Sequence, residues 1–177
     1  MVIGEEIKVF GSWFKLHFVE NKGMAMGISW GGEIGKYSLT LFRIIAIGII
    51  IYYIYTLIRE KASKGLITVM ALILAGATGN VIDSLFYGLI FSDSTHHVAS
   101  FVPFGTGYKS FMQGSVVDML SFQLFTMPEW IPLYGGQKFF PFIFNIADAA
   151  ISIGIVLIII FQKRFFESQL TGNRTED

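Results

Sequence analysis

The segment at residues 139–162, FFPFIFNIADAAISIGIVLIIIFQ, constrains the fold of this chain more than any other part of its sequence. At about 1.5 Å per residue, a helix of this length crosses a bilayer. The segment contains one acidic residue, Asp148, and an amide, Asn145, lies three positions before it. A carboxylate at membrane depth costs about 3 kcal/mol or more unless a partner or a wet cavity receives it, so Asp148 is a functional candidate. On a helix both side chains project from one face, which we expect to point away from lipid.

The composition also favours a membrane protein and excludes a water-soluble domain. Hydrophobic residues make up 53% of the chain, charged residues make up 15%, and the mean hydropathy is +0.61. The formal net charge is zero, so nothing predicts a nucleic-acid surface. Because the chain has no cysteine, disulfides, thiolate metal sites and a cysteine nucleophile are excluded. His96 and His97 have no further ligand at a suitable spacing, so we expect no metal and no cofactor.

Three spanning helices are predicted, at residues 38–58, 65–91 and 139–162. Arg43 is the only arginine or lysine within these spans. In the second span, Ala75, Gly76 and Gly79 are small residues that permit close contact between helices. In the third, Pro141 suits the first turn of a helix. We therefore predict a mostly α, polytopic membrane protein in which residues 1–177 form a single membrane-embedded domain.

Basic residues orient these helices through the positive-inside rule. They crowd the loop at residues 59–64 and begin the tail at residues 163–177, so we expect both in the cytoplasm. The loop at residues 92–138 contains only Lys109 and Lys138. This extended loop is therefore predicted to lie outside the cytoplasm.

The same count places residues 1–37 outside the cytoplasm. Partial alternation of apolar and polar residues at 14–19 predicts short strands there, in a small β-rich cradle at the membrane surface. Nothing in this segment would carry it across a membrane. We therefore expect a further spanning helix before Met1.

A second acid, Asp118, lies in a short apolar segment of the outer loop. We expect Asp118 and Asp148 to meet at the outer membrane face. Two carboxylates that share a site do not both ionise cheaply, so one proton is held between them. That arrangement is typical of aspartic proteases, in which one acid activates water and the other hydrogen-bonds the developing oxyanion.

Four motifs occur in an order that resembles the lipoprotein signal peptidases, also called signal peptidase II, of bacterial inner membranes. They are NKGMAM at residues 21–26, GNVID at 79–83, VVD at 116–118 and FNIAD at 144–148. The resemblance implies a multi-pass aspartic intramembrane endopeptidase with its active site near the periplasmic face. It also implies cleavage of prolipoproteins immediately before a diacylglyceryl-cysteine.

The resemblance further implies roles for individual residues. Asp118 and Asp148 match the catalytic dyad, and Asn21, Gly23, Asn80 and Asn145 match polar or small positions that line the substrate cleft. The partners implied are prolipoprotein substrates and membrane lipids, and we expect a monomer.

The chain departs from the family pattern in three places. The family has four transmembrane helices, and the first of them is missing here. Ser84 stands where the family usually has an arginine, and residues 89–114 form an insertion. Family members from Bacteroidetes-like lineages resemble this chain in both the serine and the loop. Arg43 either replaces the missing arginine in substrate binding or extends toward lipid phosphates as an interface anchor.

Other interpretations remain open for the acids and for the whole chain. Asp83 is expected to be structural, with Asn80 and nearby loop amides as its partners. Asp148 would pair across helices in a small ion-coupled or proton-coupled transporter, the main alternative function. A serine-type intramembrane protease is disfavoured because no Gly-x-Ser-x-Gly motif is present and no lysine lies within a predicted span. Met24 and Met26 are expected to pack or to contact lipid.

Overall fold

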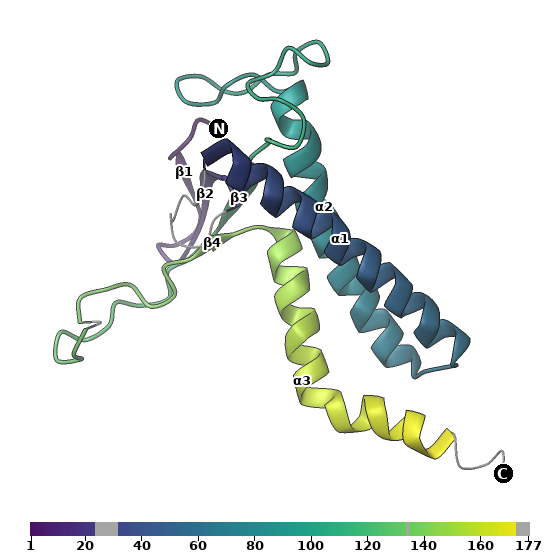
Figure 1. Ribbon diagram of the computed structural model, residues 1–177. Coiled ribbons are helices and arrows are strands. Elements are labelled where there is room, and N and C mark those ends of the chain that lie inside the picture. Colours follow the sequence, from purple (N-terminus) through teal and green to yellow (C-terminus); the bar gives the residue numbers. More distant parts are fainter. Residues whose placement is uncertain (24–31, 134, 173–177) are drawn as a thin grey trace. The chain divides into compact units, whose positions relative to one another are not determined.

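The computed structural model describes residues 1–23, 32–133 and 135–172, which contain three helices and one four-stranded sheet (Figure 1). The helices are α1 (Gly32–Arg59), α2 (Lys64–Ile90) and α3 (Ile146–Gly172), and the strands are β1 (Glu6–Phe10), β2 (Phe14–Asn21), β3 (Val116–Phe122) and β4 (Ile143–Phe144). All three helices contain stretches long and apolar enough to cross a membrane. The predicted fold class, a mostly α polytopic membrane protein with a small sheet, is therefore confirmed.

The helix ends differ from the predicted spans chiefly at the start of α1 and at both ends of α3, which continues to Gly172 instead of ending at residue 162. Helix α1 begins at Gly32 instead of residue 38, so it also contains Lys36. Helix α3 begins at Ile146 instead of residue 139, and Pro141 precedes it. The reason is strand pairing: β4 forms an antiparallel pair with β3 immediately before the helix, and this pairing uses backbone groups that a helix would need.

The chain divides into two compact units. The first contains residues 1–36 and 83–145, and the second contains residues 37–82 with the chain from Ile146 onward. Each unit is considered by itself below.

The second unit is an assembly of apolar helices. Its buried core consists of Leu57, Ala62, Leu66, Val69 and Phe165, with Ile73 and Leu157 packed against it. Glycines on α2 and α3 let these two helices approach closely. A Cβ on Gly65 would lie 2.8 Å from the Phe165 ring, and a Cβ on Gly76 would lie 2.8 Å from Ile151 Cγ1. The predicted close contact through small residues of α2 is therefore confirmed at Gly76.

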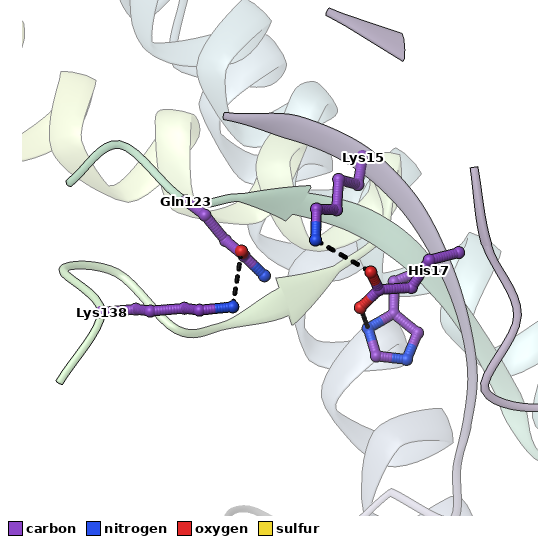
Figure 2. Close-up of polar contacts among 5 residues, drawn as sticks. Lys15, His17, Gln123 and Lys138 are labelled. Carbon is purple, nitrogen blue, oxygen red and sulfur yellow. Dashed lines mark hydrogen bonds and ion pairs between the residues drawn. The ribbon is translucent and has the colours of Figure 1, made fainter. Parts of the chain in front are cut away.

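The first unit is built on an antiparallel sheet with the strand order β1-β2-β3-β4. The register sets Val19 opposite Asp118 and Asn21 opposite Val116 in the β2–β3 pair. The strands predicted at residues 14–19 are thus confirmed as β2. At the edge of the sheet, Glu6 on β1 pairs with Lys15 and His17 on β2, as Figure 2 shows.

The inserted residues 89–114 cover the carboxyl-terminal end of α2. A helix end leaves carbonyl groups without intrahelical partners, and the insertion supplies backbone N–H donors to several of them. The donor and acceptor pairs at this end are Val102 to Ile90, Gly105 to Leu89 and Lys109 to Gly88. Two further pairs, Met112 to Leu85 and Gly114 to Ser84, lie about one turn earlier in the helix. The insertion therefore caps this end of the helix, and β3 begins shortly after it, at Val116.

Candidate active site

Asp118 lies on β3 and is only 3% exposed. Its two carboxylate oxygens accept hydrogen bonds from two side-chain amides. Asn21 Nδ2 donates to Oδ2 at 3.0 Å, and Asn145 Nδ2 donates to Oδ1 at 2.8 Å. An ionised carboxylate only accepts hydrogen bonds, so a pair of amide donors suits the charged form of this acid.

The sheet register explains how Asn21 reaches Asp118. Asn21 ends β2, and it lies on the same face as Val19, the residue opposite Asp118. Its Oδ1 accepts a hydrogen bond from Gly23 N at 2.8 Å, which orients the amide so that Nδ2 faces the carboxylate. Gly23 has φ of 86°, a left-handed conformation that favours glycine. The predicted pair Asn21 and Gly23 therefore acts together on Asp118.

Asp148 lies in the first turn of α3. Asn80 on α2 donates a hydrogen bond from Nδ2 to Asp148 Oδ1 at 2.8 Å. Close packing of the two helices permits this bond. A Cβ on Gly79 would lie 3.4 Å from Ala147 Cβ, and a Cβ on Gly76 would lie even closer to the carbonyl oxygen of Ala147.

The two Asn-x-x-Asp motifs are crossed in their hydrogen bonding. Asn80 donates to Asp148, and Asn145 donates to Asp118, so each of these amides bonds an acid of another motif. Asp83, expected to be structural with Asn80 and nearby loop amides as partners, has hydrogen-bond interactions with the Val117 backbone and the Tyr87 hydroxyl. Tyr87 is one turn further along the same helix.

The structure shows the surroundings of Ser84, where the family usually has an arginine, and the position of Arg43 on its helix. Ser84 is 0% exposed, and its carbonyl accepts from Gly114 N, so the site has no room for an arginine side chain. Arg43 is half-buried on α1. Because α1 begins at Gly32, Arg43 lies roughly 16 Å along the helix from its start, further than the predicted span implied. Met24 and Met26 lie outside the described residues.

Sequence reasoning missed two polar residues of the first unit, one buried and one half-buried. Lys36 is 7% exposed and, with Glu20, lines a cavity of about 520 Å³ in the first unit. It was overlooked because the predicted span began after it. Tyr108 belongs to the insertion, and its hydroxyl accepts from Ser115 N at 2.8 Å. Burial raises the pKa of the Tyr108 hydroxyl above its ordinary value, so it stays neutral at physiological pH.

Among residues 1–23, 32–133 and 135–172, no group of three or more histidine, cysteine or acidic side chains is placed to hold a metal ion. In the first unit, Asp118 is oriented by the amides of Asn21 and Asn145, and in the second unit, Asp148 accepts from the amide of Asn80. A carboxylate oriented in this way is suited to general acid–base catalysis.

Comparison with known proteins agrees with this chemistry. The sequence model of the family described as signal peptidase (SPase) II matches residues 1–164. A lipoprotein signal peptidase of Porphyromonas gingivalis is 43% identical over 180 residues, which cover 99% of this chain and 78% of that protein. Another, from Amoebophilus asiaticus, is 42% identical over 163 residues, covering 89% of this chain and 65% of that protein. These relatives favour a peptidase over a transporter.

Two solved structures of bacterial membrane enzymes are similar to this chain in fold. A bacterial membrane enzyme solved at 1.9 Å resolution by the in meso method has a TM-score of 0.56 and 25% sequence identity, covering 90% of this chain and 76% of that one. A second bacterial membrane enzyme, solved at 2.3 Å, has a TM-score of 0.53 and covers all of this chain.

Proposed function

Because the chain belongs to the signal peptidase II family, we propose that it removes the signal peptides of diacylglyceryl-modified prolipoproteins. The bond cut is the one immediately before the lipidated cysteine. Asp118 and Asp148 form the catalytic dyad of this multi-pass membrane endopeptidase, which works as a monomer at the periplasmic face of the bacterial inner membrane.

One observation carries the proposal for the dyad. Each acid of the proposed dyad accepts a hydrogen bond from an asparagine of another motif: Asn21 and Asn145 donate to Asp118, and Asn80 donates to Asp148. Amide donors orient a carboxylate without neutralising its charge, and this leaves it able to accept a proton.

Chain connectivity gives independent support. Asn145, whose amide is bonded to Asp118, is only three residues before Asp148 in the sequence. Three residues span at most about 10 Å even when the chain is extended. A dyad of these two acids therefore requires no distant segment to be brought in.

The reaction follows from two acids that share one proton. Asp118, with an amide on each oxygen, is the ionised member, and it takes a proton from water as that water attacks the peptide carbonyl carbon. Asp148 is the protonated member, and its hydroxyl donates to the carbonyl oxygen as negative charge develops there. As the tetrahedral intermediate collapses, the peptide C–N bond breaks and the proton held by Asp118 passes to the leaving amine.

The remaining residues of the motifs position the dyad and line the cleft. Asn21, Asn80 and Asn145 hold the two carboxylates, and Gly23 fixes the amide of Asn21. Residues 92–138 and 1–37 lie in the periplasm under this proposal, and residues 163–177 lie in the cytoplasm.

The test is cleavage of a lipidated prolipoprotein by purified protein in lipid. Asp118→Asn and Asp148→Asn should each lower the rate by about a hundredfold or more, since neither carboxamide takes up or shares a proton. The matched control is Asp93→Asn, which changes an exposed acid in the insertion and should leave the rate unchanged. Normal turnover by either dyad variant would refute the aspartic mechanism.

A further inference from the structure

The segment between β3 and β4, residues 123–142, forms a second hairpin-like ribbon that the proposed function does not use. We call it the β3–β4 ribbon. Its arms are joined by backbone hydrogen bonds from Met127 to Gln137 and from Phe139 to Phe125, each of 2.8 Å. Lys138 Nζ also donates to Gln123 Oε1 at 2.7 Å, and Figure 2 shows this contact between the arms.

The β3–β4 ribbon exposes large apolar side chains along its whole length. Trp130 and Leu133, near the tip, are 80% and 88% exposed. The arms add exposed side chains of Leu124, Phe125, Phe139, Phe140 and Phe142. Glu129 and Lys138 are the only charged residues in the segment. Such a continuous apolar surface marks a site of interaction when it occurs on a folded protein.

The same apolar surface continues at the base of the ribbon. Gln123 N donates to Trp13 O at 2.7 Å, so the turn between β1 and β2 is bonded to the first arm. Trp13 lies against Phe14 and Phe122, and the Phe14 and Phe122 rings stack with their centroids 4.7 Å apart. Aromatic side chains of this kind are enriched where a membrane meets water.

Chain order ties the ribbon to the bilayer, whatever the placement of the two units. Phe142 is four residues before Ile146, where the spanning helix α3 begins. Four extended residues cover at most about 14 Å, so the base of the ribbon cannot leave the vicinity of the membrane interface. The exposed apolar arms therefore start within reach of lipid.

We propose that the β3–β4 ribbon lies in the lipid headgroup region and anchors the first unit to the membrane surface. The occupant of its apolar surface is lipid. A two-stranded ribbon has unpaired N–H and C=O groups on its outer edges, and these need water, so the ribbon stays at interface depth and does not enter the hydrocarbon core. Trp130 suits this depth because its ring is apolar while its indole N–H is a hydrogen-bond donor. The proposal does not depend on which residues are catalytic.

Tryptophan fluorescence tests the depth of the tip. With Trp13→Phe and Trp30→Phe, Trp130 is the only tryptophan, and the protein is placed in phosphatidylcholine vesicles with or without brominated acyl chains. We expect a blue-shifted emission, strong quenching by brominated lipid and weak quenching by aqueous acrylamide. The matched control carries His97→Trp, an exposed polar position of the insertion, together with Trp13→Phe, Trp30→Phe and Trp130→Phe. It should show the reverse pattern.

Two outcomes for Trp130 itself, and a third in the comparison with the control, would overturn the proposal. One is efficient acrylamide quenching of Trp130 with no quenching by brominated lipid. The other is protection of Trp130 only after a prolipoprotein is added, which would assign the surface to substrate. Equal lipid quenching at both positions would also overturn it, because the whole unit would then lie in the interface without a specific anchor.

A second measurement avoids the tryptophan replacements. Because the chain has no cysteine, Leu133→Cys takes a single nitroxide spin label. We expect its relaxation to be enhanced more by membrane-soluble oxygen than by a water-soluble nickel chelate. A greater effect of the chelate, with folding verified by retained cleavage activity, would contradict lipid contact at the tip.

Discussion

Replacing Gly76 by alanine should show how strongly the α2–α3 contact controls the position of Asp148. The added Cβ would lie 2.8 Å from Ile151 Cγ1 and even closer to the carbonyl oxygen of Ala147. A side chain can respond by changing its rotamer, but the backbone oxygen belongs to the first turn of α3 and moves only with the helix. That turn holds Asp148, so the change acts on the Asn80 hydrogen bond of 2.8 Å.

The expected magnitude combines three terms. Overpacking of a well-packed contact costs about 1–3 kcal/mol. Weakening the hydrogen bond from Asn80 to Asp148 costs about 0.5–1.5 kcal/mol. Alanine gains at most about 1 kcal/mol over glycine from helix propensity. We therefore expect Gly76→Ala to destabilise the protein by about 2 kcal/mol and to lower kcat/KM by about tenfold or more.

Other glycines of the helices provide matched controls. Gly48 on α1 has nothing within 4 Å of an added Cβ, so Gly48→Ala should be neutral or slightly stabilising. A Cβ on Gly79 would make an ordinary contact of 3.4 Å with Ala147 Cβ, so Gly79→Ala should have a small effect. The assays are thermal unfolding in detergent and cleavage of a lipidated prolipoprotein in lipid. If Gly76→Ala matched Gly48→Ala in both, the argument from helix contact would be refuted.

Further predictions concern polar residues and topology. Asp83→Asn should lower yield or stability more than the rate per folded molecule, and a normal yield with a large loss of rate would make Asp83 catalytic. If Arg43 contacts substrate, Arg43→Ala should raise KM and Arg43→Lys should rescue little, since a bidentate fork becomes a point charge; unchanged kinetics would leave it an interface anchor. Single cysteines at Lys61 and Lys109 should be labelled from opposite sides by an impermeant thiol reagent, and same-side labelling would refute the topology. Tyr108→Phe should lower stability by about 1 kcal/mol by removing the acceptor for Ser115 N, and no change on thermal unfolding would contradict this.

Hydropathy and small-residue patterns predict the helices of this protein well. Long apolar segments have few alternatives to a helix in lipid, and the close approach at Gly76 follows from the absence of a side chain. The prediction failed at the start of α3 because apolar residues at 139–145 satisfy a helix and a strand equally. Long-range pairing of β4 with β3 decides between them, and local sequence does not contain that information.

The candidate site was predictable in its residues but not in its hydrogen bonds. Asp118, Asp148 and the asparagines were identified from their motifs. Spacing along one helix suggested Asn80 as a partner of Asp83, and it gave no indication that Asn80 donates to Asp148 across the α2–α3 contact. A side chain that bridges two elements has its partner fixed by packing, and one sequence does not reveal it. Lys36 and Tyr108 have no motif at all, so only their burial identifies them.

The insertion illustrates the same limit for backbone groups. Its residues read as a loop, and nothing in their sequence indicates that they donate hydrogen bonds to the end of α2. The last carbonyls of any buried helix end, however, require hydrogen-bond donors. Gly107 and Gly114 let the insertion approach the helix closely enough to supply them, because a Cβ at either position would collide with backbone atoms of the helix. The insertion thereby fixes the point at which β3 begins, and with it the position of Asp118.

The two amides on Asp118 lead to a test that separates stability from catalysis. In Asp118→Asn, one oxygen is replaced by an NH₂ group that would face the NH₂ of Asn21 or Asn145, so a buried donor loses its acceptor. We expect a loss of about 1–3 kcal/mol in the free energy of unfolding in addition to the loss of activity.

Adding Asn145→Asp to Asp118→Asn reverses the donor and acceptor of that hydrogen bond. The introduced carboxylate accepts from the introduced amide, whose oxygen still accepts from Asn21. Thermal unfolding of the double variant should therefore recover most of the lost stability, while cleavage stays absent because the proton acceptor at position 118 is gone. Recovery of cleavage together with stability would show that Asp118 acts only by holding β2, β3 and β4 together. Asp148 would then have to activate water without it.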